Sequence, residues 1–198
     1  KIDNKIIIII LSLFFYSWWN IYYLPVILFS IIANYYISKK IIIASKRKKK
    51  ILFIGIFLNV LIFLIFKYID FLIEILNLIF LIDIDKLGLP FPLAISFFTF
   101  QSIAFLINIY DEEILTVKAK DFFLFIIFFP QLIAGPIVKY NHMIPQFNNK
   151  KNWAFNKKNF TIGLIILAIG FIKKVYFANT LSEYVDVGYQ NIDQLNLF

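Results

Sequence analysis

Residues 121–147 read DFFLFIIFFPQLIAGPIVKYNHMIPQF, a long apolar stretch that is broken by Pro130 and again by Gly135-Pro136. A core helix of a soluble protein rarely combines so many Phe and Ile residues with two helix breakers. In hydrocarbon, a broken helix frees backbone N–H and C=O groups that lipid cannot satisfy, so it must pack inside protein or line a wet cavity. Broken membrane helices often build binding sites for this reason. The stretch predicts a membrane protein with an internal site.

The composition of the whole chain supports a membrane protein. Its 198 residues are 61% hydrophobic and only 16% charged, whereas ordinary globular domains are about 45–50% apolar and about 25% charged. Runs such as KIIIIIL (5–11) do not alternate as the strands of a membrane barrel would. The predicted fold class is therefore an all-α, polytopic membrane protein. It has about seven membrane helices or re-entrant segments, at residues 5–19, 21–38, 51–66, 69–82, 89–110, 121–138 and 159–178.

The net charge of +8 is concentrated in one place, because seven basic residues lie between positions 39 and 50. This cluster separates two apolar elements, as the Lys and Arg residues of a cytoplasmic loop do. We interpret it as a topogenic loop that contacts anionic lipid head groups, and we expect no nucleic-acid partner. Lys1 and Lys5 would then lie on the same side of the membrane. The chain has no Cys and one His, which excludes thiolate chemistry and a multi-His metal site.

Polar side chains inside the apolar elements are the candidates for function. Ser96, Thr99 and Ser102 share one face of the predicted helix 89–110, and Gln101 and Asn108 share another. Such groups either bond a neighbouring helix or line a polar passage for an acyl chain or a hydroxyl substrate.

Two further sets of residues have alternative readings. Lys67, Asp70 and Glu74 either flank a surface turn at Lys67-Tyr68 or belong to an ion pathway, which would make the chain part of a transporter. His142 is a possible general base, but no nucleophile stands near it in sequence. We interpret it as a surface-loop histidine.

Five segments, in order, resemble the membrane-bound O-acyltransferase family, in its alginate and peptidoglycan O-acetyltransferase branch. They are SLFFYSWWNIYYLPVILFSIIANYYI (12–37), FKYIDFLIEILN (66–77), PLAISFFTFQSIAFLINIYDEEI (92–114), the opening stretch, and GLIILAIGFIKKVYFANTLSEYVD (163–186). The departures are modest: Ala94 where Gly is usual, Asn108 for Asp, no Arg-Gly after Tyr110, Lys139 for Arg, and Asn179 for Asp. Lys139 keeps the charge of Arg but not its bidentate fork.

The resemblance implies transfer of an acyl group, with acetyl as the expected one, from a thioester donor such as acetyl-CoA or an acyl carrier to an exported polysaccharide such as alginate or peptidoglycan. It also implies an exported partner protein that modifies the polysaccharide, and a location in the bacterial inner membrane. No tightly bound cofactor and no metal site are expected. The substrate- or tunnel-lining candidates are Ser96, Thr99, Gln101, Gln131 and Lys139.

No residue of this chain is expected to be catalytic. The family's histidine lies in a Trp-His-Gly-like motif that is absent from this sequence, and His142 does not align with it. We therefore expect the catalytic histidine beyond Phe198, and residues 1–198 to be the amino-terminal part of a single membrane domain that is inactive alone. A polytopic transporter and a membrane scaffold without catalytic activity are the alternatives.

Overall fold

The computed structural model describes residues 3–44, 46–133 and 135–190, and this part of the chain forms helices and turns without strands. Three helical runs are long and apolar enough to cross a membrane, Asn4–Ile43, Lys48–Phe80 and Lys157–Tyr189. The all-α, multi-pass class predicted from sequence is confirmed. The chain divides into two compact units, Lys1–Asn148 and Asn149–Phe198.

The first unit begins with two helices, α1 (Asn4–Asn20) and α2 (Leu24–Ile43), joined by the 3₁₀ turn η1 (Ile21–Tyr23). The Asp3 side chain caps α1 by accepting the N–H of Lys5. At the junction, Asn20 takes an extended backbone conformation and its side chain accepts the N–H of Tyr22. The two predicted elements 5–19 and 21–38 are confirmed as separate helices.

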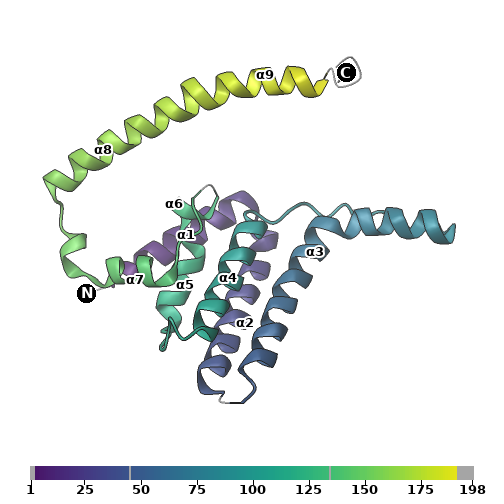
Figure 1. Ribbon diagram of the computed structural model, residues 1–198, viewed down its shortest axis with the longest axis horizontal. Helices are drawn as coiled ribbons and strands as arrows, with labels where there is room; N and C mark the ends of the chain where they lie inside the picture. Colours follow the sequence, from purple (N-terminus) through teal and green to yellow (C-terminus); the bar gives the residue numbers. More distant parts are fainter. Residues whose placement is uncertain (1–2, 45, 134, 191–198) are drawn as a thin grey trace. The chain divides into compact units, whose positions relative to one another are not determined.

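The third helix, α3 (Lys48–Phe80), is continuous where the sequence suggested two elements and a turn at Lys67-Tyr68. That turn is wrong, since both residues lie inside the helix. Its 33 residues span about 50 Å at 1.5 Å per residue, more than the roughly 30 Å of a bilayer core. The helix accordingly changes direction along its length, and its last turns run away from the other helices of its unit (Figure 1).

Helix α4 (Ile95–Tyr110) packs against α2 and α3, and residues 81–94 before it are not helical. The expected start at residue 89 is therefore too early, because Pro90 and Pro92 resist helical continuation. Between α2 and α3, the buried amides of Asn34 and Asn59 exchange two hydrogen bonds of 3.0 and 2.7 Å. This polar pair joins two otherwise apolar surfaces.

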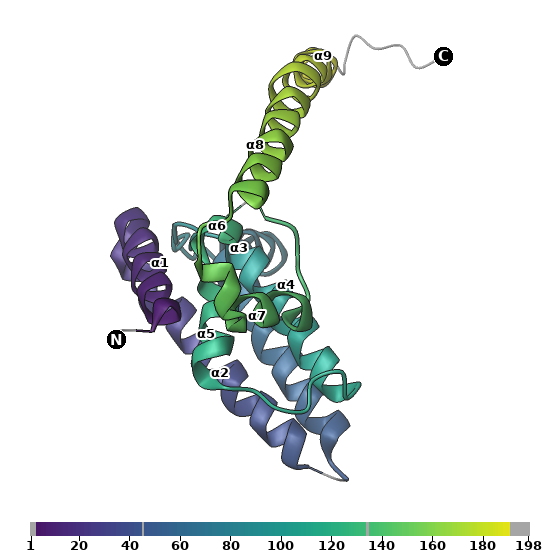
Figure 2. The ribbon, with the colours of Figure 1, turned by 90° about the vertical axis from the view of Figure 1, so that its left-hand side faces the viewer.

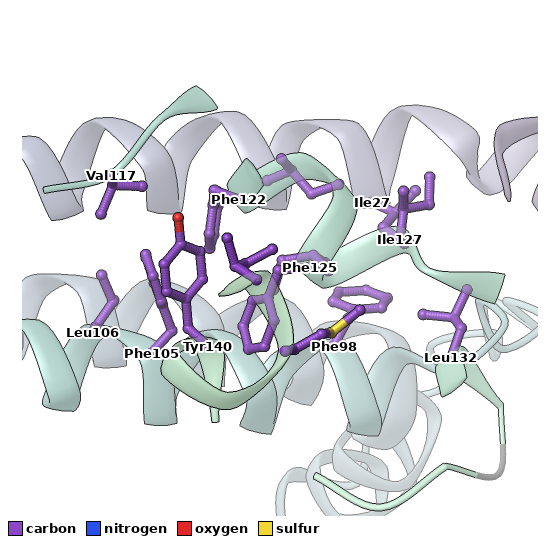
Figure 3. Close-up of a cluster of buried hydrophobic side chains, with 14 of the residues drawn as sticks. Ile27, Phe98, Phe105, Leu106, Val117, Phe122, Phe125, Ile127, Leu132 and Tyr140 are labelled. Carbon is purple, nitrogen blue, oxygen red and sulfur yellow. The ribbon is translucent and has the colours of Figure 1, made fainter. Parts of the chain in front are cut away.

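The stretch expected at 121–138 forms two helices, α5 (Ala119–Ile127) and the short α6 (Phe129–Leu132). After residues 135–139, which are neither helix nor strand, α7 (Tyr140–Asn148) follows. Helix α5 packs between α1 and α4 (Figure 2). Aromatic rings from α4, α5 and α7 form the core there (Figure 3), with the rings of Phe105 and Phe122 stacked at 4.4 Å.

The second unit contains a 3₁₀ turn, η2 (Lys150–Trp153), followed by one long helical run. The run consists of α8 (Lys157–Phe171), the π-helical stretch η3 (Ile172–Ala178) and α9 (Asn179–Gln190). It includes the predicted element 159–178. A π-helical segment widens a helix locally and is frequent at functional sites.

Candidate functional site

The break between α5 and α6 is the centre of the candidate site. The N–H of Phe128 still bonds the carbonyl of Leu124, but Pro130 has no N–H to continue the helix. The next helical bond, from the N–H of Phe129 to the carbonyl of Phe125, is not made. That carbonyl accepts the side-chain amide of Gln101 from α4, at 2.9 Å. The N–H of Phe129 donates to the Ser12 hydroxyl of α1, at 3.3 Å.

Two side chains from neighbouring helices thus satisfy the N–H of Phe129 and the carbonyl of Phe125, which would bond each other in an unbroken helix. Gln101 is only 6% exposed and Ser12 is fully buried, so neither partner could be replaced by bulk water. This is the condition under which a broken helix is tolerated at membrane depth. The sequence placed the sheltered break around Gly135, whereas the buried caps lie at residues 125–129, and Pro130 itself is exposed in this unit.

The second break, at Gly135-Pro136, is less sheltered than the sequence suggested. Gly135 is half-buried, and Pro136 and Ile137 are exposed in this unit. The Gln131 side chain donates to the Pro136 carbonyl at 2.8 Å, and the Gln131 carbonyl accepts the N–H of Gly135 at 3.0 Å. A Cβ at Gly135 would lie 2.6 Å from that carbonyl oxygen, so this tight turn requires glycine.

A cavity of about 250 Å³ adjoins the capped break, between α4, α5 and residues 137–140. Its polar lining comes from Gln101 and Asn108 of α4 and from Lys139 and Tyr140. Apolar side chains complete it: Ala104, Phe105, Phe125, Ile137 and Val138. A mainly apolar hollow with a few polar groups is the usual form of a small-molecule site.

The five sequence candidates do not share this one cavity. Gln101 and Lys139 line it, whereas Ser96 lines a separate hollow of about 270 Å³ with Lys67 and Ile133. Gln131 holds the turn at Gly135. Thr99 is buried with no hydrogen-bond partner for its hydroxyl in the described structure.

Thr99 and Ser102 are notable because both hydroxyls are buried without a partner in the described part of the chain. Buried polar groups nearly always have a partner, and each exception calls for a bound water, a ligand or another explanation. They lie one turn apart on α4, on the face that the sequence singled out. Of the two alternatives that the sequence left open for these hydroxyls, the bond to a neighbouring helix is not seen in the described structure.

The element 119–148 is held at both of its ends to the same end of the unit. Near its start, Asp121 pairs with Lys5 of α1 at 2.5 Å. Near its finish, Asn148 also accepts from the Lys5 ammonium. Lys139 pairs with Glu113, in the connection before α5, at 3.2 Å.

The same end carries the basic loop, because Lys48 pairs with Glu112 at 2.5 Å. The chain therefore runs away from this end of the unit along α5, turns at the two breaks and returns to the same end. Both ends of the element lie at the same end of the unit, which predicts a re-entrant course in the membrane and not a crossing. The prediction that Lys5 and the basic loop lie on one side agrees with these contacts.

The remaining sequence candidates have structural roles. His142 is exposed on α7, as a surface histidine but in a helix instead of a loop. The carboxylate of Asp70 accepts backbone N–H groups of residues 87 and 88, and Glu74 pairs with Lys86. Sequence reasoning missed Ser12 and Tyr140. The helix breaker Pro130 signalled that backbone groups near it would need partners, but not which helices would supply them.

Comparison with known protein families places these features in context. The fold and the capped break define a polytopic membrane protein with a re-entrant element. The sequence model of MBOAT, the membrane-bound O-acyltransferase family, matches residues 92–197, which is more than half of the chain. The chain belongs to this family.

Curated relatives agree with the assignment. A peptidoglycan O-acetyltransferase of Helicobacter pylori is 37% identical over 170 residues, which cover 73% of this chain and 32% of that protein. A probable alginate O-acetylase AlgI of Pseudomonas putida is 35% identical over 144 residues, covering 68% of this chain and 28% of that protein. The chain thus spans about a third of the length of these relatives. No solved structure gives a significant match.

Proposed function

We propose that this chain is the amino-terminal part of a single membrane domain that transfers an acyl group, acetyl in the first instance, to hydroxyls of an exported cell-surface polysaccharide. The observation that carries the proposal is the buried break after α5, capped by Gln101 and Ser12 beside a cavity. Membership of the family supplies the reaction class, and the names of the two relatives supply the acceptor class, peptidoglycan or alginate.

In this proposal the chain builds one wall of the passage in which a donor and an acceptor meet. The donor is an acyl thioester, acetyl-CoA or an acyl carrier, that approaches from the cytoplasmic face of the bacterial inner membrane. Gln101, Lys139 and the hydroxyls of Ser96 and Thr99 are the proposed lining groups, and Gln131 fixes the turn beside them. An exported partner protein would receive the acyl group and pass it to the polysaccharide.

The proton transfer from the attacking hydroxyl is left to a histidine outside these 198 residues, since the Trp-His-Gly-like motif is absent here. General-base catalysis of this kind typically increases the reaction rate by about 10²–10⁴-fold. The alternative function as a transporter depended on Asp70 and Glu74 belonging to an ion pathway. In the structure these two side chains instead bond residues 86–88.

The test compares cells that lack the full-length protein with cells complemented by the wild type or by Gln101→Ala. Mass analysis of peptidoglycan and of secreted polysaccharide should show O-acetyl groups lost in the deletion strain and restored by the wild type. Gln101→Ala should restore them only in part at equal membrane abundance. Unchanged O-acetylation in the deletion strain would refute the proposal.

A further inference from the structure

Residues 81–94 run back along the last turns of α3 and are fixed there by three of its side chains. The Asn77 amide bonds both backbone groups of Ile84, accepting its N–H at 3.0 Å and donating to its carbonyl at 2.8 Å. The Asp70 carboxylate accepts the N–H of Leu87 at 2.8 Å and that of Gly88 at 3.1 Å. We call residues 69–94 the outer hairpin.

Three polar side chains of α3 in the outer hairpin, Asp70, Glu74 and Asn77, point toward its returning arm. Positions 70, 74 and 77 share one face of α3, and Glu74 of that face pairs with Lys86 of the returning arm. Gly88 permits the turn there with a left-handed φ of +58°. Backbone groups that water could satisfy at no cost are instead bonded by side chains of the same hairpin. This arrangement suits a segment placed where water is scarce.

The outer surface of the outer hairpin is strongly apolar. Leu78 is 79% exposed, Leu81 92% and Phe91 62%, and Phe71 and Ile79 are also exposed. Contiguous apolar surface of this kind usually marks an interaction site with protein or membrane. It continues the exposed apolar side chains of the first part of α3, which in a membrane protein face lipid, among them Phe53, Phe57 and Leu61.

We propose that the outer hairpin lies in the interfacial layer of the membrane leaflet opposite the basic loop and anchors the start of α4 there. Three observations favour lipid as the occupant: the continuity with the apolar surface of α3, the excess length of α3 over a bilayer core, and the side-chain hydrogen bonds to four backbone groups of the returning arm. Segments with one apolar and one polar surface settle in this layer. Asp83 and Asp85, both exposed, would face the water.

The inference is independent of acyl transfer and can be tested with single cysteines, because the chain has none. The full-length protein carrying Leu78→Cys, Phe71→Cys or the control Asp85→Cys is reconstituted into phospholipid vesicles. One part of each sample is labelled with a fluorophore and quenched by lipids that carry a nitroxide near the head group. The other part is reacted with a membrane-impermeant maleimide in vesicles and in detergent.

We expect at least three-fold stronger lipid quenching and at least three-fold slower maleimide reaction at positions 71 and 78 than at 85. Equal reaction at all three positions without quenching would mean an open surface for an exported protein, and the proposal would fail. It would also fail if positions 71 and 78 were protected in detergent and vesicles alike but not quenched, since the rest of the protein would then cover them. Two apolar positions are used so that the test still gives a result if one of the two variants does not fold.

Discussion

Gln101 is the side chain through which α4 stabilises the break after α5. Replacing it in Gln101→Leu keeps a side chain of similar size but leaves the buried carbonyl of Phe125 without a donor. An unsatisfied buried group costs about 1–3 kcal/mol, so we expect the free energy of unfolding of the full-length protein to fall by about that amount. Denaturant unfolding in detergent micelles measures it.

The matched control is Gln131→Leu, whose amide bonds a carbonyl at an exposed turn. Its effect should be well under that of Gln101→Leu, because water can replace the lost donor there. Equal losses of stability in the two variants would contradict the assignment of Gln101 as the group that caps the break.

Asn34 and Asn59 should behave as a coupled pair. Each single replacement by Leu leaves one buried amide without its partner across the α2–α3 interface, whereas the double replacement leaves neither. Polar pairs between membrane helices are worth on average about 0.6 kcal/mol and at most about 1.7. A double-mutant cycle on the free energy of unfolding should give a coupling in that range, and strictly additive losses would show that the pair does not act as one unit.

The sequence could indicate which residues matter for the site, but it could not indicate which residues they contact. Gln101 stood out because it is an amide among apolar residues, and in the structure its side chain is buried beside the cavity. Ser12 carried no comparable signal, since one serine in an apolar helix is common. Its role depends on α1 and α5 packing together, which is a property of the tertiary structure alone.

At the scale of elements, the ion pair between Lys48 and Glu112 ties the α2–α3 loop to the α4–α5 connection. The hydrogen bond and the charge of Lys48 hold the pKa of Glu112 below its ordinary value. The folded pKa is lower than the unfolded one, so the stabilisation is complete above the unfolded pKa and is lost as pH falls through the folded pKa. The tether should therefore be intact at neutral pH and released only in acid.

Spin labels on cysteines introduced at Lys46 and Asp111 would report this release. The distance distribution between the labels should be narrow at neutral pH and broaden in acid, and Glu112→Gln should give the broad distribution at every pH. A narrow distribution in Glu112→Gln at neutral pH would show that the ion pair does not hold the two connections together.

The boundaries of two elements show where sequence patterns were misread. No Gly or Pro lies between Gly55 and Gly88, so nothing in the backbone chemistry required a turn at Lys67-Tyr68, and a charged residue alone does not end a helix. Conversely, Pro90 and Pro92 argued against a helix that starts at residue 89. Breaker residues were the better guide to these boundaries than apolar runs. The direction of the chain after Pro130, in contrast, depends on ion pairs between distant residues.

For the whole molecule, the re-entrant course of residues 119–148 decides on which side the following chain begins. A stretch of apolar residues as long as 121–138 looks like a crossing by composition alone. The contacts of Lys5 with both Asp121 and Asn148 place its two ends together. Since the same end carries the basic loop, the rule that cytoplasmic loops are rich in Lys and Arg predicts that this end faces the cytoplasm.

Single cysteines at Thr116, His142 and Asp85 of the full-length protein test this topology. In inverted and right-side-out membrane vesicles, an impermeant maleimide should label positions 116 and 142 from the cytoplasmic face and position 85 from the opposite face. The reason is geometric, because Glu113 lies beside Thr116 in the chain and bonds Lys139 and Asn141 at the start of α7. If position 142 were labelled from the same face as position 85, residues 121–138 would cross the bilayer, and the cavity beside Gln101 would have to open toward the other side.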